Sequence, residues 1–574
     1  MIIHADQFGV KSGKGYDNTL AVIFALEHSR QFEQAELVFP KGEYHFYPDQ
    51  AHEKQLFISN HDQEGLRRIV FPIFQMNNLT VDGQGSEFIF HGPMIPFVVE
   101  DSNHIVIKNL VIDWEQPMFA QGIVTRSDAD SFDVQISPHQ PYRLERNRIQ
   151  FKFGKWEPVW GMNEFDPNTN APAYQSGDRF GWGRVRDTHV EEVEPGVIRF
   201  HGLGPYIPRV ANIVALRFGR RENPAFFING GAHINLDTIC VHHAPGMGLI
   251  AQKCDSIHLH RFEVKLREGS ERIVSATADA THFVYCRGLI RIEHCLFENQ
   301  LDDPCNIHGI YAKITERLRD DQLLIELAHG MAKGIEIAGS GDEFAFVSHE
   351  SLQTYSSASV KDVRYLNKDY MIITFDQPLS DRVRINDVVE NLSWAPDVII
   401  THNIIRANRA RGLLLTTSGD ILVEHNKISV PGSGIKVSGD ANSWFESGAV
   451  KQLSIRHNEF IDCNYCCPDW GRAVIDIDPE IENPEQFEGY YHRNISIEHN
   501  RFVAFDTGII YGLSVDGLTF ANNVIENSGA YEPHHVMQYP IELKACKNVS
   551  VEGNHFATGK LAIAKINDQE VDIS

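Results

Sequence analysis

The sequence is short of positive charge. Its 574 residues include 52 Lys and Arg but 77 Asp and Glu, which gives a formal net charge of −25. A surface of this sign is repelled by phosphate backbones and by anionic lipid. The composition therefore argues against nucleic acid and membrane as partners. It favours solubility, and the alternative is a locally acidic site for a neutral sugar or a cation.

Long apolar runs are also missing. No stretch approaches the roughly 20 consecutive apolar residues of a transmembrane helix. The first residues, "MIIHADQFGV", have neither the basic start nor the apolar middle of a secretory leader. We therefore expect no signal peptide in this chain. That fits a cytoplasmic protein or an exported one whose leader has been removed, so the localisation stays open.

Cysteines are few and irregularly spaced. There are nine, an odd number, so a disulfide framework is not expected and the thiols are predicted to be free and buried. Cys463, Cys466 and Cys467 form a CxxCC cluster, but no second Cys or His pair stands nearby to complete a zinc site. We expect neither a metal nor another cofactor.

Turn pairs such as Asn-Gly, which separate the strands of a β-sandwich every ~8–12 residues, are mostly absent. Instead one phrase recurs, as in "ILVEHNKI" and "ISIEHNRF", with alternating apolar residues and then an asparagine. Successive asparagines are 23, 32, 42, 23 and 31 residues apart. Short strands at a period near 23 residues indicate a solenoid, here a right-handed parallel β-helix whose asparagines bond the next coil. The asparagines are Asn403, Asn426, Asn458, Asn500, Asn523 and Asn554.

Two stretches interrupt this rhythm and are predicted to be small antiparallel β-barrels inserted between coils. The start, "FGVKSGKGYDNTLAVIFALEHS", resembles the capping segment of pectin-lyase-like β-helices, in which a helix covers the open end. The predicted segments are 1–114 (cap and first coils), 115–215 (first barrel), 216–309 (coils with catalytic aspartates), 310–393 (second barrel) and 394–574 (C-terminal coils).

An acidic cluster falls on two of the predicted coils. Asp279, in "SATADATHFVYCRG", precedes the pair Asp302 and Asp303, in "NQLDDPCNIHG", by 23 and 24 residues, and His282 precedes Asn306 by 24. This spacing predicts neighbouring coils, with three carboxyls in one patch, and Pro304 suggests a turn that sends both paired aspartates into the cleft. Crowded carboxylates raise at least one pKa, as acid–base chemistry requires. Turn capping and a calcium site are the alternatives.

Glycoside hydrolysis with inversion needs an acid and a base about 6.5–9.5 Å apart. The aspartate patch could supply the base, with Asp303 favoured, and a carboxyl of the second barrel the acid. Glu336 is the candidate acid, because apolar flanking residues favour a protonated carboxyl. The stretch "GIKVSGDANSWFESGAV" offers amides, carboxylates and an indole face for sugar binding. The expected substrate-binding residues are His282, Asn306, His308, Asp440, Asn442, Trp444 and Glu446.

The four stretches "SATADATHFVYCRG", "QLDDPCNIHG", "HGMAKGIEIAGSGDEF" and "GIKVSGDANSWFESGAV" resemble glycoside hydrolase family 110, and the resemblance covers most of the chain. It implies an exo-acting α-galactosidase that removes terminal α-1,3-linked galactose with inversion and without a metal. It also places the base role on Asp279, Asp302 and Asp303, and the acid role on a glutamate of the second barrel, here Glu336.

Two other functions stay open at this point. A polygalacturonase-like inverting hydrolase would share the β-helix and the Asp-Asp pair, although the quoted segments offer little beyond Lys436 to bind a galacturonate carboxylate. A non-catalytic carbohydrate-binding β-helix is the second alternative, because a fold does not fix a function. A homo-oligomer that forms through exposed faces of the coils is compatible with each of these functions.

Overall fold

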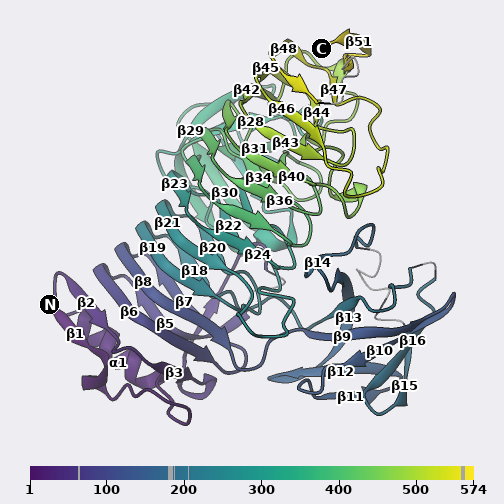
Figure 1. The fold of residues 1–574 in the computed structure, drawn as a ribbon. Helices are drawn as coiled ribbons and strands as arrows, with labels where there is room; N and C mark the ends of the chain where they lie inside the picture. The colour runs from purple at the N-terminus through teal and green to yellow at the C-terminus, as the bar shows by residue number, and fades with distance from the viewer. Residues whose placement is uncertain (62–64, 179–184, 186–187, 205, 558–562, 574) are drawn as a thin grey trace.

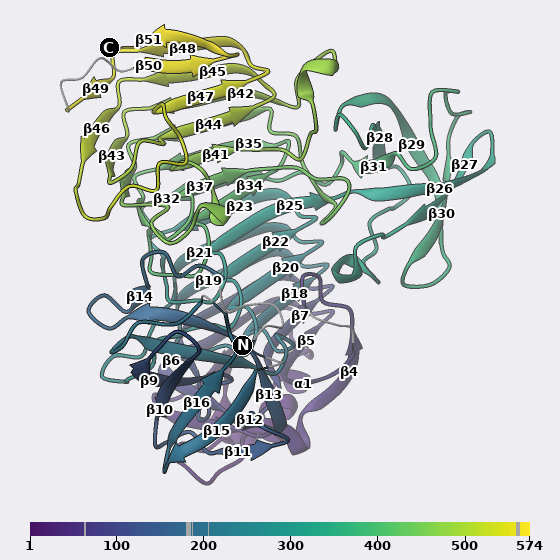
Figure 2. The same ribbon diagram turned by 90° about the vertical axis from the view of Figure 1, so that its right-hand side faces the viewer.

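The structure, a computed structural model, describes residues 1–61, 65–178, 185, 188–204, 206–557 and 563–573. Its body is a parallel β-helix that runs from the N-terminal end to the C-terminal end of the molecule (Figure 1). Two further antiparallel domains project from this body at separate places along it (Figure 2). The predicted architecture, a β-helix with two inserted β domains, is confirmed.

One parallel sheet of the β-helix carries the candidate site. Apolar residues on its inner face, such as Phe283, Ile307 and Leu415, are buried in the solenoid core, and the alternate residues point outward. The strands that stack on this face are β18 (Phe226–Asn229), β20 (Leu249–Gln252), β22 (Thr281–Val284), β25 (Cys305–Ile310), β34 (Leu413–Thr416), β37 (Ile435–Val437), β41 (Ile475–Ile477), β44 (Ile510–Leu513) and β47 (Ile541–Lys544).

The second parallel sheet has 21 strands and contains the recurring phrase. Its strands include β6 (Asn77–Phe90) and β8 (Asn103–Trp114), which are the predicted first coils. Later members are β19 (Ala232–Val241), β21 (Asp255–Val264), β23 (Arg287–Glu293), β32 (Asp397–Thr401), β35 (Asp420–Glu424), β39 (Gln452–Arg456), β42 (His492–Glu498), β45 (Val515–Ala521) and β48 (Lys547–Glu552).

The recurring asparagines form a buried ladder. The backbone N–H of Asn403 donates to Oδ1 of Asn426 at 2.9 Å, and the N–H of Asn426 donates to Oδ1 of Asn458 at 2.9 Å. The same contact repeats from coil to coil as far as Asn554. Each side chain thus satisfies a backbone donor of the neighbouring coil, as the sequence predicted, and this is why an asparagine ends each phrase.

The N-terminal end is capped by helix α1 (Thr19–Ser29), which buries Val22, Ala25 and Leu26 against the first coils (Figure 1). The cap prediction is therefore confirmed. All nine cysteines are free and eight are buried, as expected of small apolar side chains. Among the described residues, no helix is long and apolar enough to cross a membrane.

The first inserted domain is a nine-stranded antiparallel sheet. It follows β8 and returns the chain to β18 (Figure 1). Its strands are β9 (Ala120–Ser127), β10 (Ser131–Ile136), β11 (Tyr142–Glu145), β12 (Arg148–Phe153), β13 (Lys155–Asp166), β14 (Ala171–Pro172), β15 (His189–Glu194), β16 (Val197–His201) and β17 (Ile213–Phe218).

The second inserted domain is a closed antiparallel barrel with its own apolar core. It leaves the β-helix directly after β25 and returns to it at β32, so it stands beside the coil that carries the paired aspartates (Figure 2). In barrel order its strands are β26 (Ala312–Arg319), β27 (Gln322–Glu326), β30 (Tyr370–Phe375), β29 (Thr354–Tyr365), β28 (Glu343–Val347) and β31 (Val388–Asn391).

Candidate active site

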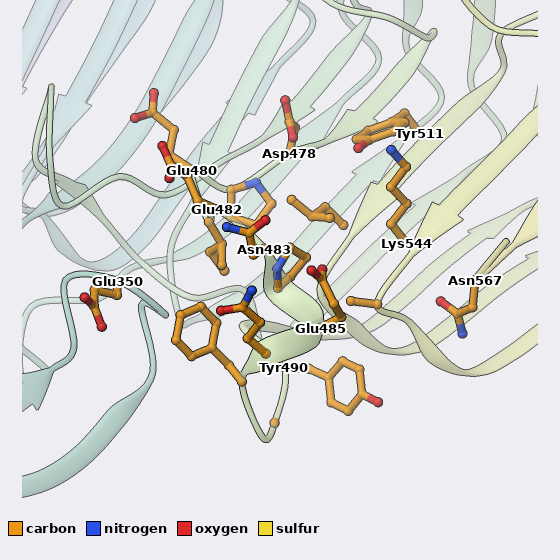
Figure 3. Close-up of a pocket in the computed structure, with 18 of the residues that line it drawn as sticks. Glu350, Asp478, Glu480, Glu482, Asn483, Glu485, Tyr490, Tyr511, Lys544 and Asn567 are labelled. Atoms are coloured by element: carbon orange, nitrogen blue, oxygen red, sulfur yellow. The ribbon is translucent and has the colours of Figure 1, made fainter.

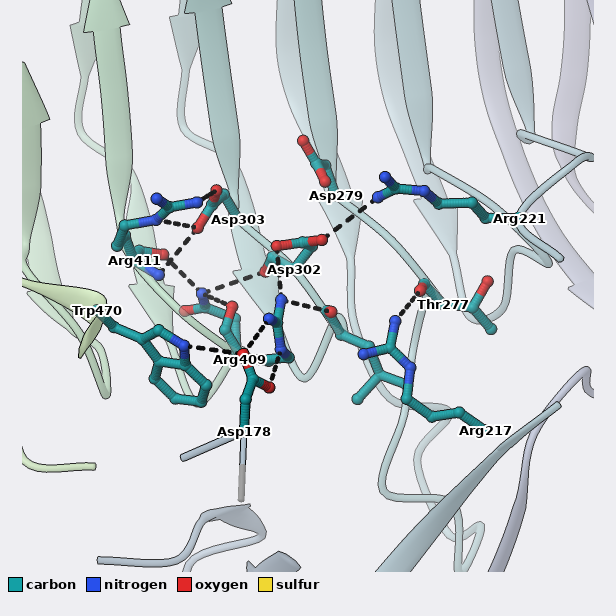
Figure 4. A network of polar contacts seen from close by, with 12 residues as sticks. Asp178, Arg217, Arg221, Thr277, Asp279, Asp302, Asp303, Arg409, Arg411 and Trp470 are labelled. Carbon is teal, nitrogen blue, oxygen red and sulfur yellow. Dashed lines mark hydrogen bonds and ion pairs between the residues drawn. The ribbon is translucent and has the colours of Figure 1, made fainter. Parts of the chain in front are cut away.

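The strand register places the aspartates on neighbouring coils. Strands β22 and β25 pair in parallel with His282 opposite Asn306. Just before these strands, the N–H of Ala280 donates to the carbonyl of Asp303 at 3.0 Å, so Asp279 and Asp303 lie side by side in the stack. The neighbouring-coil prediction is confirmed. Asp302 and Asp303 lie in a bend ahead of β25, and both side chains enter one polar network (Figure 4).

Asp302 is held between two arginines. Its Oδ1 accepts from Arg409 at 2.8 Å, and its Oδ2 accepts from Arg221 at 3.3 Å. Burial alone raises the pKa of this carboxyl, but the positive charges of Arg409, Arg221 and Arg411 outweigh burial and set the pKa below its ordinary value. Asp302 is therefore ionised at neutral pH.

Asp303 is paired with one arginine on the following coil. Its Oδ1 accepts from the backbone N–H of Arg411 at 2.9 Å, and its Oδ2 accepts from the Arg411 guanidinium at 2.8 Å. Burial raises the pKa of Asp303 to about 7; the Arg411 charge opposes this rise, and the neighbouring Asp302 and Asp279 reinforce it. The two adjacent aspartates thus have separated pKa values.

Asp279 forms no ion pair with an arginine of the described part of the chain and instead begins a buried chain of hydrogen bonds. Its Oδ2 lies 2.8 Å from Nδ1 of His282, whose Nε2 lies 2.9 Å from Nε2 of His308. Nδ1 of His308 faces the carbonyl of Gly309 at 2.7 Å and must donate to it. Burial, and then the charge of Asp302, raise the pKa of Asp279 well above its ordinary value.

The direction of this chain fixes where its proton lies. With both imidazoles neutral, His308 uses its only N–H on Gly309, so its Nε2 accepts from Nε2–H of His282. Nδ1 of His282 is then an acceptor and needs a donor, which is the protonated carboxyl of Asp279. Burial and the nearby His308 lower the pKa of His282 well below its ordinary value, which keeps that ring neutral. Asp279 is therefore the protonated member of the cluster.

A residue of the first inserted domain completes the network. Asp178 accepts from Nε of Arg409 at 2.8 Å and from Nη2 at 2.5 Å, and the indole N–H of Trp470 donates to it at 3.1 Å (Figure 4). Burial raises the pKa of Asp178, but the Arg409 charge outweighs it and lowers that pKa to about 2. Asp178 therefore holds Arg409 in the position from which it binds Asp302.

Asp302 lines a small cavity of 60 Å³ that also has lining residues from both inserted domains and from the β-helix. Arg217 of β17 lines it and lies 4.6 Å from the ring of Trp160. Burial and the charge of Arg409 lower the pKa of Arg217 to about 10. Met331, in the short helix η4 (Gly330–Ala332) of the second domain, forms the opposite side. Several arginines thus line this cavity, and Asp302 is its lining carboxyl.

A much larger cavity of 1330 Å³ lies further along the same sheet, toward the C-terminus (Figure 3). It is lined by the end of β41, by β44 and β47, by the loop 478–490, and by His349 and Glu350 of the second domain. None of the three aspartates lines it, although Asn442 does. Of the three aspartates, Asp302 therefore lines the small cavity, and none of them lines the large one.

Several predicted binding residues gather around the aspartates. His282 and His308 form the chain described above, and Asn306 is buried beside them with no hydrogen-bond partner for its Oδ1 among the described residues. Glu446, in the short strand β38 (Glu446–Ser447), pairs with Ile310 of β25, and its Oε1 is 3.5 Å from Nε2 of His308. The Asn306 amide oxygen is thus a buried acceptor next to His282, with no partner among the described residues.

Glu336 is not brought to this cluster. Its side chain is 63% exposed and bonds Nζ of Lys253 at 2.9 Å. Lys253 directly follows β20, next to Gln252, which pairs with Val284 at the far end of β22. From Asp279 to that end the strand advances roughly 15–20 Å. The structure therefore gives Glu336 neither the burial nor the location that the sequence suggested for an acid.

The loop after β37 differs from expectation as well. Asp440 is buried, and its carboxylate accepts from the backbone N–H groups of Asn442, Ser443, Trp444 and Phe445. It therefore organises its own loop and has no free face for a sugar. Asn442 donates to the carbonyl of His349, whereas Trp444 is 43% exposed and packs on the ring of His329. Of these residues, Trp444 is the one that presents an apolar face to solvent.

Sequence reasoning missed the arginines. Arg411 is 108 residues from Asp303. The second insertion, taken as 310–393, accounts for 84 of these, and 108 − 84 = 24, which is one coil. Subtracting the insertion would therefore have found Arg411. Asp178, Arg217 and Arg221 carry no such periodic signal, because they come from the first insertion and from the loop that follows it.

No site for a metal stands out in this cluster. Arginine side chains already occupy Asp302 and Asp303, so a divalent cation would have to displace two ion pairs. The positive charges of Arg217 and Arg221 beside the cavity further disfavour a cation. Carboxylates and guanidinium groups can both bind the hydroxyl groups of a ligand.

Comparison with known proteins gives matches along the whole chain. Family models match residues 120–214 (GLAA-B beta-barrel domain I) and residues 322–389 (GLAA-B beta-barrel domain II). Alpha-1,3-galactosidase B of Bacteroides thetaiotaomicron is 35% identical over 100% of this chain and 94% of its own length. Alpha-1,3-galactosidase A of Shewanella woodyi is 34% identical, with 96% of this chain and 90% of that protein aligned.

Alpha-1,3-galactosidase B of Phocaeicola vulgatus is 35% identical over 93% of this chain and 90% of its own length. Among solved structures, an exopolygalacturonase from Thermotoga maritima matches 97% of this chain and 92% of its own at 11% identity and a TM-score of 0.42. That structural likeness bears on neither the substrate nor the site.

Proposed function

The chain belongs to the alpha-1,3-galactosidase family, glycoside hydrolase family 110, and on that premise we propose that it is an exo-acting, inverting hydrolase. Its proposed substrates are oligosaccharides or glycoconjugates that end in α-1,3-linked galactose. A carbohydrate substrate follows from the family, and the negative charge of −25 supports the absence of nucleic acid and membrane partners.

The observation that carries the proposal is the separation of protonation states within one buried cluster. Asp302 is ionised because Arg409 and Arg221 bind it, whereas burial keeps Asp279 protonated. Pairs of carboxyls whose environments drive their pKa values apart are how glycosidases assign an acid and a base. A sugar-binding module without catalytic function has no need of such a pair.

We assign the acid to Asp279 and the base to Asp302. Asp303 is the weaker base candidate, because it lies beside Asp279 at one strand spacing, about 4.8 Å, which is less than the roughly 6.5–9.5 Å that inversion needs. Asp279 gives its proton to the glycosidic oxygen as the bond to the anomeric carbon breaks. A water attacks the opposite face of that carbon and loses a proton to the base, so the product is β-galactose. Of the two base candidates, Asp302 is the one that stays ionised across the neutral range.

This assignment replaces the acid that the sequence suggested in the second barrel. Glu336 is exposed and paired with Lys253, whereas Asp279 is buried and borders the paired aspartates. His282 and His308 support the new assignment, since with both imidazoles neutral their hydrogen bonds place a proton on Asp279. They also offer a route by which a new proton reaches that carboxyl after each turnover.

A proton NMR time course on α-1,3-galactobiose tests the function. We expect free galactose to be released and to appear first as the β-anomer, with the α-anomer growing in only by mutarotation. An α-anomer formed first would contradict inversion. Failure to cleave α-1,3-galactobiose and blood-group B trisaccharide, alongside cleavage of polygalacturonate, would contradict the proposed substrate.

A further inference from the structure

Three possible metal ligands meet on the outer face of the first inserted domain, away from the aspartates. His189 and Glu191 lie two residues apart on β15, and His201 of β16 is directly opposite His189 in the antiparallel register. One ligand atom from each lies within 4.8 Å of the others. Alternate residues of both strands, such as Val190 and Phe200, are buried on the inner face. The three polar side chains therefore share the solvent-facing side.

The surrounding charges leave the Glu191 carboxylate in contact with a histidine and not with Arg199. Arg199 is opposite Glu191 in the register, but its guanidinium is bound by Asp133 at 2.7 Å and 2.9 Å. Glu191 instead faces His201, with Oε1 3.0 Å from Nε2. Ligand atoms on a tetrahedral zinc ion, with bonds of about 2.0–2.1 Å, lie about 3.3 Å apart. The pair is therefore already close to the spacing of two metal ligands.

We propose that His189, Glu191 and His201 bind a divalent transition metal, with Zn²⁺ as the best match. Two imidazoles and one carboxylate favour Zn²⁺, Ni²⁺ or Cu²⁺ over Ca²⁺ and Mg²⁺, which prefer oxygen ligands only. Water completes the coordination on the exposed side. Because β15 is the edge strand of its sheet, the ion ties that edge to β16. This site has no part in the proposed hydrolysis and does not depend on it.

Calorimetric titration of the EDTA-treated, dialysed full-length chain with ZnCl₂ tests the proposal. We expect the tightest binding step to take up one Zn²⁺ per chain. The affinity of this step should fall roughly tenfold or more in His201→Ala and in Glu191→Gln. The matched control is the double variant His104→Ala/His233→Ala. It removes another exposed, stacked imidazole pair, 4.7 Å between ring centroids, that is not part of any three-ligand group among the described residues.

CoCl₂ gives a second readout, because Co²⁺ held by histidine in a low-coordinate site absorbs in the visible region. We expect this absorption in the wild type and in the control double variant, and its loss in His201→Ala. Far-ultraviolet circular dichroism checks that each exposed substitution leaves the fold unchanged. Equal Zn²⁺ binding by the wild type and His201→Ala, or a loss confined to the control variant, would overturn the proposal. So would CaCl₂ competing with Zn²⁺ at equal concentration.

Discussion

Oδ2 of Asp279 lies 2.8 Å from Nδ1 of His282, and burial raises the pKa of this carboxyl well above its ordinary value. When both imidazoles are neutral, the fixed acceptor at the other end of the chain, the carbonyl of Gly309, makes Asp279 the donor, and this does not require a substrate. A buried carboxyl that is protonated before substrate arrives is the state that a general acid needs. The first prediction tests this state by separating proton donation from bond cleavage.

Asp279→Asn is expected to lower kcat on α-1,3-galactobiose by about 10²–10⁴-fold, because the leaving oxygen no longer receives a proton. The same variant should keep most of its activity on α-galactosyl fluoride, whose leaving group needs no proton. Asp302→Asn should lose activity on both substrates, since both still need an activated water. Steady-state kinetics on the two substrates measure the difference. If Asp302→Asn, and not Asp279→Asn, retains fluoride hydrolysis, the acid and base assignments are reversed.

Arg221→Gln should move the acidic limb of the kcat/KM profile to higher pH. Arg221 binds Oδ2 of Asp302 at 3.3 Å, and its positive charge helps to hold the pKa of that carboxyl below the ordinary value. A base is lost as the pH falls through its pKa, so raising the pKa raises the pH at which activity disappears. A shift of about one unit or more is expected from the loss of one adjacent charge.

The matched control for this shift is Arg220→Gln. Arg220 is the preceding residue, is exposed and lines the same small cavity, but the largest charge effects on the pKa of Asp302 come from Arg409, Arg221, Arg411 and Arg217. We expect the Arg220→Gln profile to keep the acidic limb of the wild type. An unchanged limb in Arg221→Gln would contradict the base role of Asp302, whereas a loss of rate without a shift would indicate a role for Arg221 in substrate binding.

Asp303 should make the folded protein less stable as the pH rises from about 4 to 7. Its pKa is raised to about 7 by burial, above the value of roughly 3.9 for an unfolded chain. Folding therefore favours the protonated form. Its contribution is fully present below the unfolded pKa and is lost as the pH rises toward the folded pKa.

Urea unfolding at pH 4.5, 5.5 and 7 measures this effect. Asp303→Asn cannot ionise at this position. As the pH rises, the unfolding free energy of the variant should therefore increase steadily relative to that of the wild type. The full change is on the order of a few kcal/mol. A gap that is constant with pH would show that Asp303 has an ordinary pKa in the folded protein.

The sequence predicted well what repeats locally. The phrase that ends in asparagine carries the strand, the turn and the coil-to-coil bond within about eight residues, so the β-helix could be predicted without long-range information. The register of His282 with Asn306 followed because no insertion separates β22 from β25. The free and buried state of the cysteines followed from their irregular spacing.

What depends on insertions could not be predicted in the same way. Arg411 meets Asp303 only because the chain returns to the next coil after the whole second barrel. Asp178 reaches Arg409 from the first insertion, 231 residues earlier. No periodicity links such residues, and their pairing depends on how each inserted domain packs on the coils. The pKa of Asp302 therefore had to come from the structure.

Glu336→Gln is expected to keep kcat on α-1,3-galactobiose within about threefold of the wild type, as for other exposed ion pairs that contribute little. The apolar neighbours Ile335 and Ile337 are buried in the barrel core, so alternation turns the glutamate between them outward, where it is 63% exposed beside Lys253. Lys253→Gln is the matched control, since it breaks the same ion pair without removing a carboxyl. A loss of 10²-fold or more in Glu336→Gln alone, with full activity on α-galactosyl fluoride, would return the acid role to the second barrel and take it from Asp279.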